Sequence, residues 1–67
     1  MSDHQYLSRD ELAQLPLGTL LGFASSLIKY TFWGMDAYDH DDFFTINSEG
    51  EFQQWYANAH DFYVEGT

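Results

Sequence analysis

The sequence predicts an α+β fold in which N-terminal helices pack on a small antiparallel β-sheet, in a single compact domain spanning residues 1–67. Three observations predict it. Apolar residues recur at helical spacing in the run 17–33. The runs 43–46 and 62–64 consist of aromatic and β-branched residues, which are typical of strands. The chain has no cysteine and is 19% aromatic, which indicates that large rings rather than disulfides build the core.

Residues 8–14 are expected to form the first helix. Ser8 and Glu11 have the spacing of a capping box, in which the hydroxyl accepts a backbone N–H and the glutamate reaches back. Acidic residues in the first turn also suit the positive end of a helix. Pro16 ends the run, because it pushes Leu15 away from helical backbone angles.

Residues 17–33 are expected to form a second, longer helix that serves as the hydrophobic spine, with Gly34 as its stop. The segment is too short and too polar to cross a membrane. A stripe of small residues at Gly18, Gly22 and Ser26 indicates close packing of a neighbouring helix or strand. The residues of the expected apolar face are Leu17, Leu20, Leu21, Ala24, Leu27 and Ile28.

Residues 35–42 are expected to form an exposed loop, because they show no apolar period. Four of these eight residues are acidic, namely Asp36, Asp39, Asp41 and Asp42.

The C-terminal segment, 43–67, has two alternative interpretations between its predicted strands. In one, residues 47–50 form a hairpin turn with Gly50 in the left-handed conformation, and 51–56 is the middle strand of a meander. In the other, a second capping box at Ser48 and Glu51 starts a helix within 49–59. We favour the helix, because two consecutive glutamines interrupt the alternation expected of a strand.

Eleven acidic residues against two basic ones give a net charge of -9. So few bases argue against direct binding to nucleic acid and to anionic membranes. The high aromatic content argues against a disordered acidic tail. The absence of cysteine fits a reducing compartment, and no secretory signal is recognisable at the N-terminus. The sequence therefore predicts a cytoplasmic protein.

The sequence shows no pattern typical of catalysis, so no enzyme and no cofactor is expected. His4, His40 and His60 lack the spacing of a zinc site, and the aspartates do not fit a calcium-binding EF-hand loop. No nucleophile elbow or phosphate-binding glycine loop occurs. Weak, nonspecific divalent binding by Asp39, Asp41 and Asp42 stays as an alternative.

The charge itself is the strongest functional signal. Magnitudes of about 2–8 keep a small domain soluble, and a larger excess destabilises the compact state. A globule of this length has a diameter of roughly 28 Å, along which one DNA strand places about eight phosphates. The charge therefore resembles that of a DNA strand as long as the protein, with Tyr38, Trp55, Tyr56 and Tyr63 as expected aromatic anchors.

In size and character, with the acidic run 36–42 as its most distinctive stretch, the chain resembles phage-encoded anti-CRISPR proteins that mimic DNA. The resemblance implies an inhibitor that binds the basic DNA- or PAM-binding surface of a type I effector complex, and type I-C is the suspected type. It also implies that the protein acts in the cytoplasm of a bacterial host cell. It implies no functional residue by motif. The charge argument predicts the partner-binding residues, which are Asp36, Asp39, Asp41, Asp42, Glu49, Glu51, Asp61 and Glu65.

Two other hypotheses come from the same residues. The first is a non-mimic interaction module, such as an antitoxin or regulator subunit, that docks through aromatic residues such as Trp55 or Tyr63. The second is a metal-responsive protein that uses His40 and its neighbouring aspartates. The chain is expected to be a monomer or a small homo-oligomer, in which the apolar helix packs against a second copy.

Overall fold

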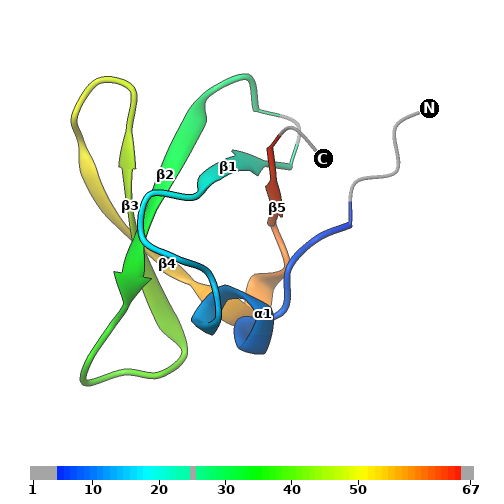
Figure 1. Ribbon diagram of the computed structural model, residues 1–67, viewed down its shortest axis with the longest axis vertical. Coiled ribbons are helices and arrows are strands. Elements are labelled where there is room, and N and C mark those ends of the chain that lie inside the picture. The colour runs from blue at the N-terminus through cyan, green and yellow to red at the C-terminus, as the bar shows by residue number, and fades with distance from the viewer. Residues whose placement is uncertain (1–4, 25, 66–67) are drawn as a thin grey trace.

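The computed structural model describes residues 5–24 and 26–65. Within them, five antiparallel strands form one sheet in the order β4-β3-β2-β1-β5, as Figure 1 shows. The elements in chain order are α1 (Arg9–Ala13), β1 (Leu20–Phe23), β2 (Lys29–Met35), β3 (Asp42–Asn47), β4 (Phe52–Tyr56), the 3-10 helix η1 (Ala57–Ala59) and β5 (Phe62–Val64).

The prediction of N-terminal helices packed on a sheet is wrong, because the described residues contain one α-helix of five residues and a single 3-10 turn. The expected helix over 17–33 is instead β1, a turn and β2. Its supposed apolar face is divided: Leu21 is fully buried, whereas Leu27 is 93% exposed. The single-domain prediction is not affected by this correction.

Local residues explain why the segment 17–33 is extended. Gly18 has a φ of +93°, a backbone conformation that interrupts an α-helix. Within β2 the buried residues Tyr30 and Phe32 alternate with more exposed neighbours, the period of a strand. Ala24, with a φ of +36°, lies in the turn between β1 and β2. Ser25 lies outside the described residues, as do Asp3 and His4.

The predicted start and end of the first helix are confirmed. The Ser8 hydroxyl accepts the Glu11 N–H at 3.3 Å, and Glu11 Oε1 accepts the Ser8 N–H at 2.9 Å, so the capping box is complete. The helix ends after Ala13, ahead of Pro16, as the proline predicts.

The C-terminal segment folds as the meander, and the favoured helix within 49–59 is wrong. β4 takes the middle of that range, and only the three residues of η1 are helical. No capping box forms at Ser48. Instead Asn47 Oδ1 accepts the N–H groups of Glu49 and Glu51, each at 2.9 Å, and Gly50 takes the expected left-handed conformation with a φ of +83°. Asn47 therefore organises a hairpin turn where a helix start was expected.

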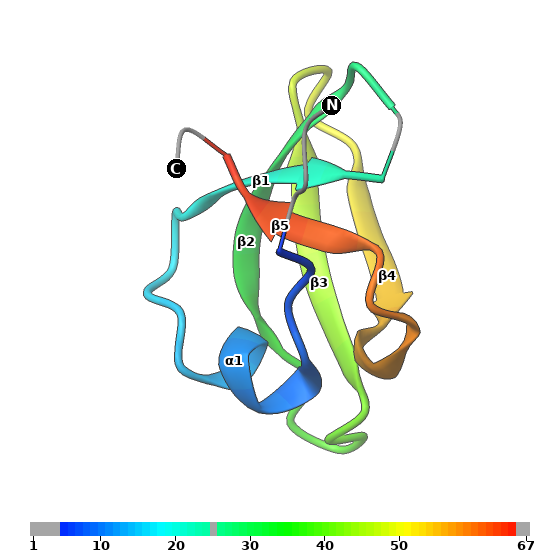
Figure 2. The same cartoon turned by 90° about the vertical axis from the view of Figure 1, so that its right-hand side faces the viewer.

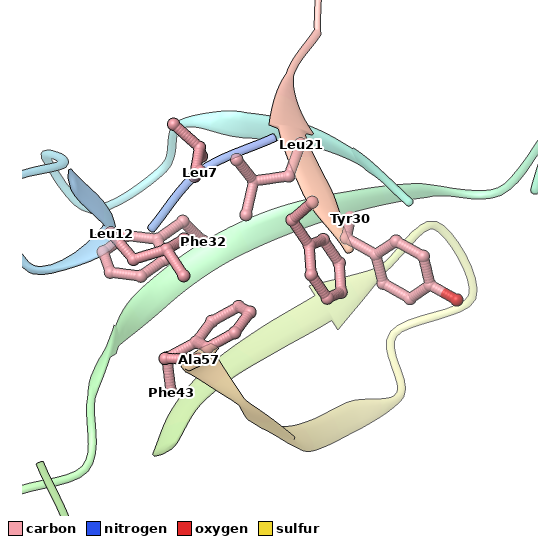
Figure 3. Packing of buried hydrophobic residues seen from close by; sticks show 8 residues of the cluster. Leu7, Leu12, Leu21, Tyr30, Phe32, Phe43 and Ala57 are labelled. Atoms are coloured by element: carbon pink, nitrogen blue, oxygen red, sulfur yellow. The ribbon is translucent and has the colours of Figure 1, made fainter. Parts of the chain in front are cut away.

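The sheet curls over its own core, because β1 and β5 run across the direction of β2, β3 and β4 (Figure 2). The indole ring of Trp55 on β4 lies 5.1 Å from the rings of Phe23 on β1 and Phe62 on β5, so the inner faces of opposite ends of the sheet meet. Figure 3 shows Phe32, Phe43 and Leu21 pointing into this interior. The radius of gyration is 11.0 Å, with extents of 37 × 26 × 18 Å.

The small-residue stripe marks one close approach, at Gly22. A Cβ atom on Gly22 would lie 2.3 Å from Cζ of Tyr63, which is closer than two carbons can pack. Gly22 and Tyr63 are directly paired across β1 and β5, so the missing side chain makes room for the tyrosine ring. The expected packing of a neighbouring strand is therefore seen at Gly22.

Candidate functional site at the acidic end of the fold

The loop between β2 and β3 lies at one end of the long axis of the molecule, next to α1 and η1 (Figure 2). Four of the predicted partner-binding residues belong to it or to its junction with β3, and Asp10 on α1 joins them. We call this set the acidic end, and its members are Asp10, Asp36, Asp39, Asp41 and Asp42.

Aspartate side chains themselves shape this loop. Asp36 Oδ1 accepts the N–H groups of Tyr38 at 2.8 Å and Asp39 at 3.3 Å, and Asp39 Oδ1 accepts the Asp41 N–H at 3.1 Å. Short carboxylates suit such local turns because they reach backbone two or three residues ahead. The backbone N–H of Asp36 donates to the Asp42 carbonyl at 2.9 Å and closes the loop. The acids are thus held in a defined arrangement.

Two neighbouring elements tie the loop down. Asn58 in η1 donates to Asp41 Oδ1 at 3.2 Å, and Arg9 in α1 donates to the His40 carbonyl at 2.9 Å. Arg9 also pairs with Asp10 at 2.6 Å and lies 3.6 Å from Asp41. These pairs are partly exposed, so each contributes little stability. Their effect is to place α1 against the loop and to add Asp10 to the acidic end.

The acidic end has a strong excess of negative charge. It holds five aspartates, and in the part of the chain that the structure describes Arg9 is the one basic side chain paired with them. The other base of the chain, Lys29, pairs with Glu65 at 2.9 Å. An exposed cluster with so little compensation creates a potential that attracts basic partners.

The other four predicted residues do not join the acidic end. Glu49 and Glu51 belong to the β3–β4 hairpin, at the opposite end of β3, and Glu51 Oε1 accepts an N–H of the Asn47 amide at 2.8 Å. Asp61 lies between η1 and β5, where its carbonyl accepts the Ala24 N–H. Glu65 follows β5 and binds Lys29. The acids therefore do not share a single face.

The ammonium of Lys29 has a pKa above its ordinary value. Its hydrogen bond to Glu65 raises the pKa, burial partly opposes this, and the charges of Glu65 and Tyr63 add to the rise. The ion pair thus links β2 to the end of β5, and Lys29 neutralises most of the charge of Glu65.

The expected aromatic anchors fall into two groups. Tyr38 is 98% exposed within the acidic loop, and Tyr56 is exposed on β4 opposite Asp42. Trp55 instead faces the core, where its indole N–H donates to Thr45 Oγ1 at 2.8 Å. Tyr63 covers Gly22. Tyr38 and Tyr56 therefore remain candidates for contacting a partner, and Trp55 serves the core.

Sequence reasoning missed a second surface on the outer face of the sheet, the side away from the core. Its apolar residues come from β1, β2, β3 and β4, and Trp33 (49% exposed) and Phe52 (57% exposed) are prominent in it. We call it the outer-face patch, and it consists of Leu20, Trp33, Phe44, Ile46, Phe52 and Tyr56.

The metal hypothesis finds no site in the described part of the chain, where no three or more His, Asp or Glu side chains are grouped to hold an ion. His40 contributes its carbonyl to Arg9, and the nearby aspartates bind backbone N–H groups. Among residues 5–24 and 26–65, no helix has the length and apolar character required for a membrane span.

Comparison of the chain with protein-family models, curated protein sequences and solved structures finds no match.

Proposed function

We propose that this protein is an anti-CRISPR-type inhibitor, an acidic DNA mimic that binds the basic DNA- or PAM-binding surface of a type I CRISPR effector complex and blocks target DNA. The observation that supports it most is the convergence of five aspartates, from α1 and the β2–β3 region, at one end of the fold. The proposed partner is a basic nucleic-acid-binding subunit, and neither nucleic acid nor a membrane is a direct ligand.

The geometry of the acidic end favours partner binding over solubility alone as the reason for its charge. Gln54 donates to both Asp36 and Asp42, so the two carboxylates are held together although like charges repel. A loop that only kept the protein soluble would not need this arrangement, because scattered acids serve that purpose. A partner that normally holds phosphates offers lysines and arginines that can pair with such a cluster.

A second candidate function is a non-mimic interaction module, and the outer-face patch favours it. Exposed aromatic residues in a contiguous surface are typical of protein interfaces. In this alternative, the partner is recognised through residues such as Trp33 and Phe52, and binding depends little on salt.

The test is a competition assay with purified type I effector complex, including type I-C, and a labelled target duplex. The proposal predicts that the protein displaces the duplex, and that the triple change Asp39→Asn, Asp41→Asn and Asp42→Asn abolishes displacement. Asparagine keeps the Oδ1 acceptors that shape the loop, so the change removes charge with little effect on geometry.

A matched control removes three charges elsewhere through Glu49→Gln, Glu51→Gln and Asp61→Asn. It has the same net charge as the loop triple, and we expect it to keep inhibiting with a much smaller loss, because these three acids lie outside the acidic end. Normal duplex binding in the presence of excess wild-type protein would refute the CRISPR proposal. Equal loss of inhibition in both triples would show that total charge, not the acidic end, is responsible.

A further inference from the structure

The outer-face patch is continuous across four strands. Leu20 is directly opposite Thr31, Thr31 opposite Ile46, and Ile46 opposite Phe52. Residues that are directly paired in neighbouring strands project to the same face of a sheet, so these side chains form one row. The rings of Phe44 and Phe52 stack with their centroids 5.0 Å apart and join this row to the next.

The patch is not needed to complete the core. Buried residues of β3 alternate with the patch residues Phe44 and Ile46, so the patch occupies the opposite side of the sheet from the core. Trp33, Phe52 and Tyr56 keep about half of their surface exposed. A small domain of limited stability leaves such rings in water at a cost, which indicates that another molecule covers them.

Charges at both ends of the patch restrict what that molecule is. At one end Tyr56 is directly opposite Asp42, and Gln54 on the same strand binds Asp36 and Asp42. Past the other end of β3 and β4, the hairpin carries Glu49 and Glu51. The patch is thus an apolar surface with acids at both ends.

A second copy of the chain is a poor occupant of this surface. Packed face to face with acidic ends aligned, two copies place aspartates beside aspartates. Packed in the reverse direction, they place Asp36 and Asp42 near Glu49 and Glu51. Like charges brought together at an interface oppose association, and Lys29 is already bound to Glu65.

We infer that the outer-face patch docks a protein partner whose apolar surface is flanked by lysine and arginine residues. This inference rests on the proposed function and deepens it, because it adds an apolar surface to the basic surface already proposed for the partner. The aromatic residues supply the contacts that slow dissociation, since anchors of this kind carry most binding energy. The acidic end supplies steering and the salt dependence of association.

The test uses a synthetic amphipathic peptide of leucine and lysine, which combines an apolar surface with positive charge. Its binding to the isotope-labelled full chain is measured by NMR. Two further probes separate its properties: a peptide in which glutamine replaces lysine, and polylysine. We expect the leucine–lysine peptide to shift the Trp33 indole signal and to bind at least about tenfold more tightly than either comparison probe.

Variants locate the binding surface. Trp33→Ser and Phe52→Ser are expected to weaken binding of the peptide by about tenfold or more, because each removes an exposed anchor. Tyr56→Ser provides a third variant if either of these fails to fold. Leu27→Ser is the matched control, since Leu27 is even more exposed but lies outside the patch, in the β1–β2 turn, and it should bind normally.

Three results would overturn the inference: polylysine binding as tightly as the amphipathic peptide, signal changes that map away from the patch, or a homodimer that Phe52→Ser dissociates in sedimentation equilibrium. The proposed function fails separately. If the effector complex keeps its duplex while the peptide binds the patch, the docking surface stands and the CRISPR partner does not.

Discussion

Asp36 and Asp42 share one side-chain amide, with Gln54 Nε2 at 3.1 Å from Asp36 Oδ2 and 2.7 Å from Asp42 Oδ2. Gln54 lies on β4, the strand that contributes Phe52 and Tyr56 to the outer-face patch, and its amide links that strand to the acidic end. Hydrogen bonds to charged acceptors are stronger than those between neutral groups, so Gln54 offsets the repulsion between the two carboxylates.

Gln54→Glu should therefore destabilise the fold, because it replaces the shared donor with a third carboxylate. We expect a loss of about 1–2 kcal/mol at low ionic strength, and partial recovery at high salt because salt screens exposed charges. Urea denaturation at two salt concentrations measures both effects. Gln5→Glu adds the same charge at an exposed position away from this cluster, and an equal loss in that variant would contradict the account.

The Lys29–Glu65 pair predicts a pH dependence of stability. Because the hydrogen bond to Glu65 raises the pKa of Lys29, the folded state holds this proton more tightly than the unfolded state. The contribution is complete below the unfolded pKa and is lost as the pH rises through the folded pKa. Glu65→Gln should lower the Lys29 pKa in an NMR titration, and the stability difference from wild type should shrink at high pH. An unchanged pKa would refute the pairing.

Phe62 is the centre of the aromatic core, and it is 3% exposed. Phe62→Ala should cost about 3–5 kcal/mol, the usual range for truncating a buried phenylalanine, and this is enough to unfold much of a domain this small. Phe52→Ala removes the same ring from the outer face and should cost far less. Thermal unfolding followed by circular dichroism compares the two. The rings that contact Phe62 are Phe23, Tyr30, Phe43 and Trp55.

Gly22 and Tyr63 should be coupled in stability. Gly22→Ala places a methyl group where the Tyr63 ring lies, so the ring must move, at an expected cost of about 1–3 kcal/mol. Tyr63→Ala removes the obstruction, and Gly22→Ala should be nearly neutral in that background. A double-mutant cycle measures the coupling. Additive effects of the two changes would show that the ring does not depend on the missing side chain.

Local signals in the sequence were the ones that could be interpreted correctly. The Ser8 and Glu11 capping box and the strand around Phe43 each depend on residues that are close together in the sequence. The left-handed Gly50 belongs to the meander, the alternative that the sequence did not favour. The run 17–33 was misassigned because short apolar runs satisfy helical and extended patterns equally well. Which of its leucines is buried depends on pairing with β5, a contact that is distant in sequence.

The candidate site was only partly predictable for the same reason. The acidic run 36–42 stands out in the sequence, and its members do lie together. No sequence pattern near Asp10 predicts that it lies beside them. Its position depends on the hydrogen bond from Arg9 to the His40 carbonyl, which is distant in sequence. The outer-face patch depends on the register of four strands. A period of two was obscured in β4, where Gln53 faces inward and Gln54 binds the aspartates.

The most direct measurement is the affinity of the protein for a type I effector complex, free of DNA, across a salt series. We expect a steep loss of affinity with salt for the wild type, and a loss nearly as steep for the Glu49→Gln, Glu51→Gln, Asp61→Asn control, which keeps the acidic end intact. The Asp39→Asn, Asp41→Asn, Asp42→Asn variant should bind at least about tenfold more weakly at low salt and show a shallower slope. Wild-type affinity and slope in that variant would contradict the assignment of the acidic end as the binding site.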